Sequence, residues 1–204
     1  MRTCAGVGPP KPVMGLIHQL AFYPTLGYNM ARNYWSNKWW PWYSRIDEVV
    51  ILGALPFKST MNELIDKEKV GGVVCLNQPH EIEHSWSAAK DDWVARGVKY
   101  YWLPTPDFTY VPCIDDIANA VKFIRSFEGT GQSVYVHCKA GRSRSALVVA
   151  CYLMERHTWY TNTALDYMYH RRYQVSLRDL HFLALNDFAA RIHNKVDTND
   201  NRVK

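Results

Sequence analysis

Residues 133–154 read SVYVHCKAGRSRSALVVACYLM, and this stretch decides the fold. The β-branched run 133–136 is typical of a buried strand, and the apolar run 145–154 is typical of a helix. Between them, the loop from Cys138 to Arg144 contains several small residues. Backbone N–H groups and the helix dipole point into a loop of this kind, so it can hold an anion. The stretch therefore predicts a phosphate-binding cradle.

Elsewhere in the chain, short apolar runs alternate with longer helical patterns. Strands are expected at 49–52, 73–76, 98–103 and 133–136. Helices are expected near 60–68, 85–96 and 113–128, and then at 144–156, 161–171 and 178–193. Strands that alternate with helices and end in a helical cluster are typical of an α/β fold. We expect a central, mostly parallel sheet flanked by helices, with a helical C-terminal part.

The distribution of charge divides the chain. The net charge is +5, from 24 Lys and Arg against 19 Asp and Glu. Residues 1–46 hold five bases and no acid, so the remaining residues carry 19 of each sign. A nucleic-acid-binding domain would carry its bases on the folded body, so nucleic acid is not an expected partner. We expect a basic leader at 1–44, a main domain at 45–193 and a polar tail at 194–204.

The leader is also rich in aromatic residues. Nine of the chain's 28 Phe, Trp and Tyr residues lie between Phe22 and Tyr43, interleaved with Arg32 and Lys38. Rings and bases together favour the headgroup region of a membrane. The alternative is a flap whose rings pack on the main domain, and both can hold at once. An acid-free, basic segment also suits mitochondrial import, whereas no apolar run reaches the ~18 residues of a membrane span.

The spacing Cys-x5-Arg, formed by Cys138 and Arg144, adds a reaction to the cradle. N–H donors and a nearby arginine can lower a cysteine pKa from ~8.5 to roughly 3.5–7.5, which produces a nucleophilic thiolate. The fork of Arg144 can bind two phosphoryl oxygens. We therefore expect attack on phosphorus and a covalent phosphocysteine. The residues expected to bind the phosphate are Lys139, Ala140, Gly141, Arg142, Ser143 and Arg144.

Asp107 is the candidate general acid. It lies 31 residues before Cys138, in a proline-bounded loop after the third predicted strand. Because loops at one end of a parallel sheet meet over the same crevice, Asp107 is expected to reach the cradle. It would protonate the leaving oxygen and then act as base on water. Ser145 is expected to donate a hydrogen bond to the sulfur, and His137 to brace the loop.

These residues resemble a known family. The stretch 137–145, HCKAGRSRS, is similar to the signature of the cysteine-dependent protein tyrosine phosphatase superfamily, in its dual-specificity branch. Within that branch the chain resembles the mitochondrial enzymes that remove phosphate from phosphatidylglycerophosphate. The similar stretches are FYPTL at 22–26, RID at 45–47, LGALP at 52–56, Trp93 with Gly97-Val98, and 134–145, within roughly 22–190.

The resemblance implies a phosphatase fold that uses no metal and no cofactor. It also implies work in the cardiolipin pathway, as a peripheral enzyme at the matrix face of the inner mitochondrial membrane, with anionic phospholipid as substrate. Two segments depart from the family pattern. An acidic Asn-Glu-Glu-Tyr-Glu stretch is represented here by 77–81 (NQPHE), and an Arg-Pro-Gly-Gln segment by 176–179 (SLRD). Roles that the family assigns to these segments do not transfer.

Other patterns have simpler interpretations. Residues 80–84 match H-E-x-x-H, but zinc chemistry needs a helix and a third ligand, and a polar loop beside the phosphate site is favoured. The scattered cysteines form no C-x-x-C pair and are typical of free thiols. Basic side chains expected on solvated faces are Lys122, Arg125, Arg171, Arg172, His157, His170, His181 and His193. Apolar side chains expected in the core are Phe182, Leu183, Leu185 and Phe188.

The sequence leaves the substrate open. Lys139, Arg142 and Arg144 give the loop three cations, which favours a lipid with a polyanionic headgroup. The same catalytic residues would suffice for a dual-specificity protein phosphatase, and Lys139 directly after the nucleophile resembles the loop of phosphoinositide phosphatases. A phosphate-binding adaptor without turnover is a further alternative.

Overall fold

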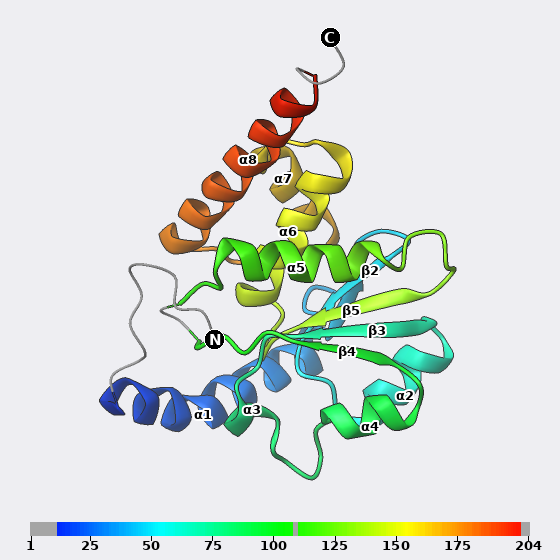
Figure 1. Cartoon of the computed structure of the whole chain (residues 1–204). Helices are drawn as coiled ribbons and strands as arrows, with labels where there is room; N and C mark the ends of the chain where they lie inside the picture. The colour runs from blue at the N-terminus through cyan, green and yellow to red at the C-terminus, as the bar shows by residue number, and fades with distance from the viewer. Residues whose placement is uncertain (1–11, 108–109, 201–204) are drawn as a thin grey trace.

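The computed structural model describes residues 12–107 and 110–200, and it contains a five-stranded sheet with helices on both faces (Figure 1). The strands are β1 (Tyr43–Arg45), β2 (Val50–Gly53), β3 (Val70–Cys75), β4 (Lys99–Trp102) and β5 (Ser133–His137). Their order across the sheet is β1-β2-β5-β3-β4. β2, β5, β3 and β4 run parallel, and β1 joins the edge of the sheet antiparallel to β2. The predicted α/β fold with a mostly parallel sheet is confirmed.

The helices lie in two groups. Those before β4 in the chain are α1 (Pro12–Ser36), α2 (Lys58–Asp66), α3 (Pro79–Ile82) and α4 (Lys90–Ala95). Those after β4 are α5 (Ile114–Arg125), α6 (Arg144–His157), α7 (Thr161–Arg171) and α8 (Asp179–Asp200). Figure 1 shows the first group below the sheet and the second group above it.

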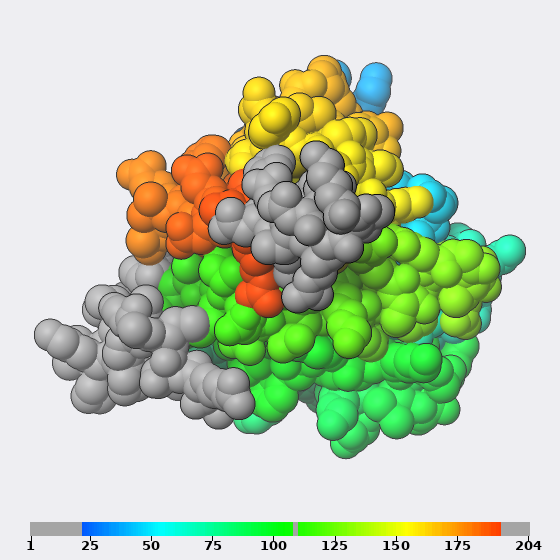
Figure 2. Space-filling view, turned by 45° about the horizontal axis from the view of Figure 1, so that its top comes forward, coloured from blue at the N-terminus to red at the C-terminus, as the bar shows by residue number. Residues whose placement is uncertain are grey.

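The core has its centre at β5, which lies between β2 and β3 and is buried along its whole length. Because alternate side chains of a strand point to opposite faces, β5 contributes to two apolar clusters. Val134 and Val136 pack with α5, α6 and α8, whereas Tyr135 packs with α2 and α4. Helix α6 is buried from Arg144 to Met154, because α5, α7 and α8 surround it. The space-filling view shows the orange and red residues of α8 against the green residues of α5 (Figure 2).

Three elements go beyond the expectation from sequence: α1, β1 and α3. The expected division at residue 45 falls inside β1, which pairs with β2 through Tyr43 to Arg45. Helix α1 packs on the domain because Phe22 and Leu26 form a small apolar cluster with Leu55. At the other end, α8 continues to Asp200, past the expected start of the tail. Residues 1–11 and 201–204 of the predicted leader and tail lie outside the described residues.

The prediction of core residues in α8 is wrong for two of the four. Leu185 and Phe188 are fully buried, but Phe182 is 40% exposed and Leu183 is 60% exposed. The reason is that α8 presents a single face to α5, α6 and α7, and residues 182 and 183 lie off that face. No helix of the described residues is both long enough and apolar enough to cross a bilayer.

Candidate active site

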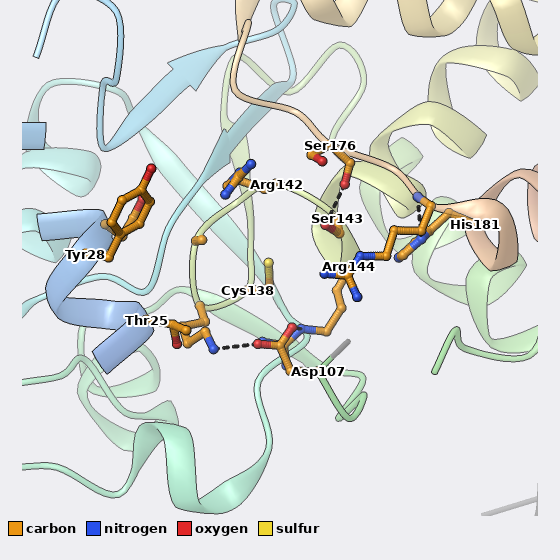
Figure 3. Close-up of a pocket in the computed structure, with 13 residues that line it drawn as sticks. Thr25, Tyr28, Asp107, Cys138, Arg142, Ser143, Arg144, Ser176 and His181 are labelled. Atoms are coloured by element: carbon orange, nitrogen blue, oxygen red, sulfur yellow. Dashed lines mark hydrogen bonds and ion pairs between the residues drawn. The ribbon is translucent and has the colours of Figure 1, made fainter. Parts of the chain in front are cut away.

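The predicted cradle lies between the end of β5 and the start of α6. Cys138 is 3% exposed and lies within a pocket, where the loop 138–143 curves around its sulfur (Figure 3). Ser145, in the first turn of α6, donates a hydrogen bond from Oγ to Cys138 Sγ at 3.2 Å. The pocket is lined by Thr25, Tyr28, Asn29, Asp107, Cys138, Lys139, Ala140, Arg142, Ser143, Arg144, Ser176, Arg178 and His181.

The loop requires glycine at one position. Gly141 has a φ of +63°, in the left-handed region that side chains disfavour. A Cβ at this position would also lie 2.3 Å from the carbonyl oxygen of Gly53, at the end of β2. The backbone of Gly53 cannot move aside as a flexible side chain could, so a larger residue at 141 would not fit. Glycine at this position therefore allows the loop to pass directly over the end of β2.

Arg144 is held in place by a carboxylate from α3. Its Nη1 and Nη2 atoms lie 2.8 and 2.9 Å from the two carboxylate oxygens of Glu81, in a fork of two parallel hydrogen bonds. Nη1 also donates to the carbonyl oxygen of Thr105 at 2.8 Å. Both charged side chains are almost fully buried, at 2% and 3% exposure. Burial is the largest single influence on Glu81 and raises its pKa, but the Arg144 charge, the hydrogen bonds from Arg144 and the backbone N–H of Gln78 together lower the pKa below its ordinary value, so the carboxyl group stays ionised.

Asp107 reaches the cradle, as predicted. Its carboxylate lies 2.5 Å from Lys139 Nζ and 3.2 Å from Arg144 Nε (Figure 3). The Nε edge of Arg144 therefore faces the pocket, while the opposite edge is occupied by Glu81. This arrangement places a carboxyl group beside the atoms that would bind a phosphate.

The electrostatics of the loop favour a thiolate at Cys138. Burial alone would raise the pKa of this cysteine, but the Arg144 charge and the hydrogen bonds from Ser145 lower it below its ordinary value. Cys75 and Cys151 show the opposite: burial raises the pKa of Cys75 to about 12, and that of Cys151 above the ordinary value as well. Of these three free thiols, Cys138 is the one in an environment that stabilises the anion.

The remaining predicted site residues lie on or next to the loop. Arg142 donates from Nε to the carbonyl oxygen of Gln174 at 3.0 Å, and Ser143 Oγ donates to the carbonyl oxygen of Ser176 at 2.6 Å. His137 is fully buried, and its ring stacks on Tyr135 at 5.4 Å between centroids. Burial lowers the pKa of His137 to about 3, so the ring is neutral and supports the loop by packing.

Two basic residues assigned to solvated faces are in fact buried against the site, so that expectation is wrong for both. Arg172 is 1% exposed and donates to the carbonyl oxygens of Gly141 and Ala140 at 2.8 and 3.3 Å. His181 is 4% exposed, lines the pocket, and accepts a hydrogen bond at Nδ1 from the backbone N–H of Arg178. The loop residues that Arg172 contacts lie 31 and 32 residues away in the chain, and the pocket that His181 lines is built from distant segments, so local patterns give no signal for either residue.

The H-E-x-x-H segment has a structural use. Pro79 to Ile82 form α3, and both carboxylate oxygens of Glu81 bind Arg144. The ring of His84 stacks between Phe22 and Trp86, at 5.4 and 4.9 Å. Glu81 is therefore a site residue that motif reasoning missed, and the only signal for it in the sequence was its match to the last position of the family's acidic stretch.

The fold and the site together define a cysteine-dependent phosphatase. The model of the dual specificity phosphatase catalytic domain matches residues 64–191. The chain is 38% identical to phosphatidylglycerophosphatase and protein-tyrosine phosphatase 1 of Mus musculus, over 83% of this chain and 88% of that protein. It is 35% identical to phosphatidylglycerophosphate phosphatase PTPMT2 of Arabidopsis thaliana, over 88% of this chain and 76% of that protein.

Solved structures agree. The crystal structure of PTPMT1 in complex with PI(5)P matches with a TM-score of 0.73 at 37% identity, covering 76% of this chain and 99% of that chain. The crystal structure of Tk-PTP in the active form matches with a TM-score of 0.67 at 25% identity, covering 74% of this chain and 99% of that chain. The chain belongs to the dual specificity phosphatase family.

Proposed function

We propose that the protein hydrolyses the terminal phosphomonoester of phosphatidylglycerophosphate to give phosphatidylglycerol, a step of cardiolipin synthesis. The observation that carries this proposal is one pocket that joins Cys138, Arg144 and Asp107, in a chain similar over most of its length to proteins named for this activity.

In the first step, the thiolate of Cys138 attacks phosphorus and the bond to the lipid's glycerol oxygen breaks. The phosphoryl oxygens bind the backbone N–H groups of the loop and the Nε edge of Arg144, which carries their developing charge. The phosphate competes with the Asp107 carboxylate for Arg144 and Lys139. Once displaced from these cations, Asp107 takes up a proton from solvent and gives it to the leaving oxygen. The products are the free alcohol and a phosphocysteine.

In the second step, water attacks the phosphocysteine and the S–P bond breaks. Asp107, now ionised, accepts a proton from the water, so one residue serves as acid and then as base. The hydroxyl of Ser145, 3.2 Å from the sulfur, donates a hydrogen bond to the thiolate as it leaves. Inorganic phosphate departs and Cys138 is restored.

A phosphoinositide is the second candidate substrate. The observation that favours it is the similarity to a PTPMT1 structure that holds PI(5)P. Phosphotyrosine in proteins is a third, because the mouse relative is also named a protein-tyrosine phosphatase. All three carry a phosphomonoester on a hydroxyl oxygen, and they differ in the rest of the molecule attached to that oxygen.

A phosphate-release assay separates the candidates. Phosphatidylglycerophosphate, PI(5)P and a phosphotyrosine peptide are compared in mixed micelles or buffer, with Cys138→Ser as the blank. We expect the highest kcat/KM on phosphatidylglycerophosphate and no turnover by Cys138→Ser, which keeps the loop but lacks the thiolate. Faster hydrolysis of the peptide than of the lipid would overturn the lipid assignment, and turnover by Cys138→Ser would overturn the phosphocysteine.

We also propose that the end of α1 and the turn after it dock on an anionic membrane, at the matrix face of the inner mitochondrial membrane. Tyr34, Trp35 and Trp39 are 84%, 78% and 66% exposed, and the ammonium group of Lys38 lies 5.5 Å from the ring of Trp39. Exposed rings next to a cation suit the headgroup region, where each basic side chain contributes about 1 kcal/mol. The same helix lines the pocket, so docking would bring the site to its lipid.

Vesicle cosedimentation tests the docking surface. The full chain is mixed with phosphatidylcholine vesicles, with or without cardiolipin, and compared with the double variant Trp35→Ser, Trp39→Ser. Tyr160→Ser, which removes an exposed ring far from α1 at the start of α7, is the matched control. We expect cardiolipin-dependent binding that only the double variant loses. Equal binding by all three proteins would contradict the assignment to α1.

A further inference from the structure

Helix α1 lies outside the part of the chain that the family model matches, yet it forms one wall of the pocket. The match to the family begins at residue 64, whereas Thr25, Tyr28 and Asn29 of α1 line the pocket that contains Cys138 (Figure 3). The wall is anchored: Phe22 is 1% exposed in its cluster with Leu55. A helix fixed against the catalytic loop can discriminate between substrates by the chemical group to which their phosphate is attached.

Trp40, just after α1, connects this wall to the loop. Its indole is 5% exposed and donates from Nε1 to Asn29 Oδ1 at 2.8 Å. Two guanidinium groups lie near the same indole ring, Arg32 at 4.5 Å and Arg142 at 5.1 Å from its centroid. Arg142 belongs to the phosphate-binding loop, so one of these two cations lies in the pocket itself.

The charges of Arg32 and Arg142 are not neutralised within the described part of the chain. Arg142 donates to a carbonyl oxygen, and the contacts of Arg32 are with the rings of Tyr28 and Trp40. The Nε of Arg32 is buried without an acceptor. In contrast, Arg144 is paired with Glu81, and Lys139 with Asp107. Two positive charges close to one ring repel each other, and a bound anion would remove that cost.

We propose that Arg32 and Arg142 form a second anion subsite, which binds the phosphodiester of a phospholipid headgroup while its phosphomonoester occupies the loop. This inference rests on the proposed lipid phosphatase function. Phosphatidylglycerophosphate and PI(5)P both carry a phosphodiester one small polyol away from the phosphomonoester. Guanidinium groups suit phosphate oxygens because they donate in a planar fork. A phosphotyrosine peptide offers no second phosphate, so the subsite selects lipid over peptide.

The test uses a short-chain phosphatidylglycerophosphate that dissolves as a monomer, so that membrane docking plays no part. For the wild type and for Arg32→Gln, kcat/KM is measured on this lipid and on p-nitrophenyl phosphate, which has no phosphodiester. A charge-assisted hydrogen bond contributes ~1.5–3 kcal/mol, so the lipid-to-aryl ratio of kcat/KM should fall by roughly 10–100-fold in Arg32→Gln. Arg32→Lys should restore part of the ratio, because it keeps the charge but not the fork.

Arg171→Gln is the matched control. Arg171 also lies on a ring, 3.4 Å from the centroid of Tyr167, but on α7, whereas Arg32 lies on the helix that lines the pocket and shares the Trp40 ring with Arg142. This control should keep the wild-type ratio. Inhibition by inorganic phosphate distinguishes the two anion sites: Arg32→Gln should keep the wild-type inhibition constant, because free phosphate fills the loop.

Three results would overturn the subsite. They are an unchanged ratio in Arg32→Gln, an equal loss on both substrates, and a matching rise in the inhibition constant of phosphate. Failure of the proposed function would look different, because the wild type itself would then prefer the phosphopeptide to the lipid.

Discussion

Arg144 uses the two edges of its guanidinium group for different purposes. The edge formed by Nη1 and Nη2 is occupied by the buried carboxylate of Glu81, and the Nε edge faces Asp107 and the pocket. This ion pair, together with the hydrogen bond to the carbonyl oxygen of Thr105, therefore fixes the rotamer of the arginine that would bind the phosphoryl oxygens. We therefore expect Glu81 to be a positioning residue, which would act on substrate only through Arg144.

Glu81→Gln should lower kcat/KM on p-nitrophenyl phosphate by roughly 10–100-fold and reduce the free energy of unfolding by about 3–5 kcal/mol. Removing one partner leaves the other charge buried and unpaired. A purely structural role predicts only these two losses, whereas a positioning role also predicts a change in the pKa of Cys138. Without the neighbouring carboxylate, the Arg144 charge acts more strongly on Cys138, so the pKa of the thiol should fall further. The acid limb of the pH profile of kcat/KM should therefore move to lower pH.

Glu83→Gln is the control for this prediction, since Glu83 is exposed two residues further along the chain. It should behave as the wild type in rate, stability and pH profile. If Glu81→Gln lost activity while the acid limb stayed in place, Glu81 would serve the fold and not the thiolate.

His137 makes stability depend on pH. Burial lowers the pKa of this histidine to about 3 in the folded state, whereas the unfolded chain has the ordinary value near 6.5. Below pH 6.5 the unfolded state therefore binds a proton that the folded state does not. The free energy of unfolding should fall as the pH drops from 6.5 toward 3, with a slope approaching ~1.4 kcal/mol per pH unit from this group alone.

Urea denaturation between pH 7 and 5 measures the slope. His137→Asn should flatten it, while His170→Asn should leave it unchanged, because His170 is exposed on α7. His181, whose pKa burial also lowers, contributes in the same direction and explains any remaining slope. A wild-type stability that is constant over this range would contradict the buried, neutral state of His137.

At the scale of elements, Arg172 ties the end of α7 to the phosphate-binding loop and to the segment before β1. It donates to the carbonyl oxygens of Gly141, Ala140, Pro41 and Trp42 and to the hydroxyl of Ser44. Within the described part of the chain, none of its partners is a carboxylate, and burial lowers its pKa to about 10. The energy of this contact comes from hydrogen bonds made by a planar fork, not from an ion pair.

Arg172→Lys should therefore fail to replace arginine, although it keeps the charge. A lysine has three donors at one point, which cannot reach the carbonyl oxygens of both the loop and the segment before β1. We expect the free energy of unfolding to fall by about 1–3 kcal/mol, and kcat on p-nitrophenyl phosphate to fall roughly tenfold because the loop loses its support. Arg171→Lys, at the exposed neighbouring position, should change neither quantity. Full activity in Arg172→Lys would show that the loop holds its shape without these bonds.

The elements that the sequence predicts are those with a strong local pattern. β5 and α6 were predictable because a β-branched run and an apolar helix flank a loop of fixed spacing. β1 and α3 span three and four residues, too few for a period to show. That Cys138, Arg144 and Asp107 meet in one pocket was predictable from spacing and loop position, whereas Glu81, Arg172 and His181 reach the site from distant elements. Their contacts arise from tertiary packing, which leaves no trace in local periodicity.

At the scale of the whole molecule, α1 is a separate packing unit on the sheet domain. Its apolar attachment is the small cluster of Phe22, Leu26 and Leu55, which is distinct from the two clusters on the faces of the sheet. Trp40 adds a polar link through Asn29. A helix that is attached through a cluster of its own can open without unfolding the domain.

Phe22→Ala tests this independence. Truncating a buried phenylalanine typically costs about 3–5 kcal/mol, which should exceed what holds α1 in place. The amides of α1 should then exchange with deuterium roughly 100-fold faster or more, while the urea midpoint of the sheet domain changes little. Tyr34→Ala, at an 84% exposed position of the same helix, should leave exchange unchanged. If the α1 amides of the wild type exchanged only through global unfolding, α1 and the sheet would form one cooperative unit. A detached α1 should also lower the lipid-to-aryl ratio of kcat/KM, because the pocket would lose the wall that carries Arg32.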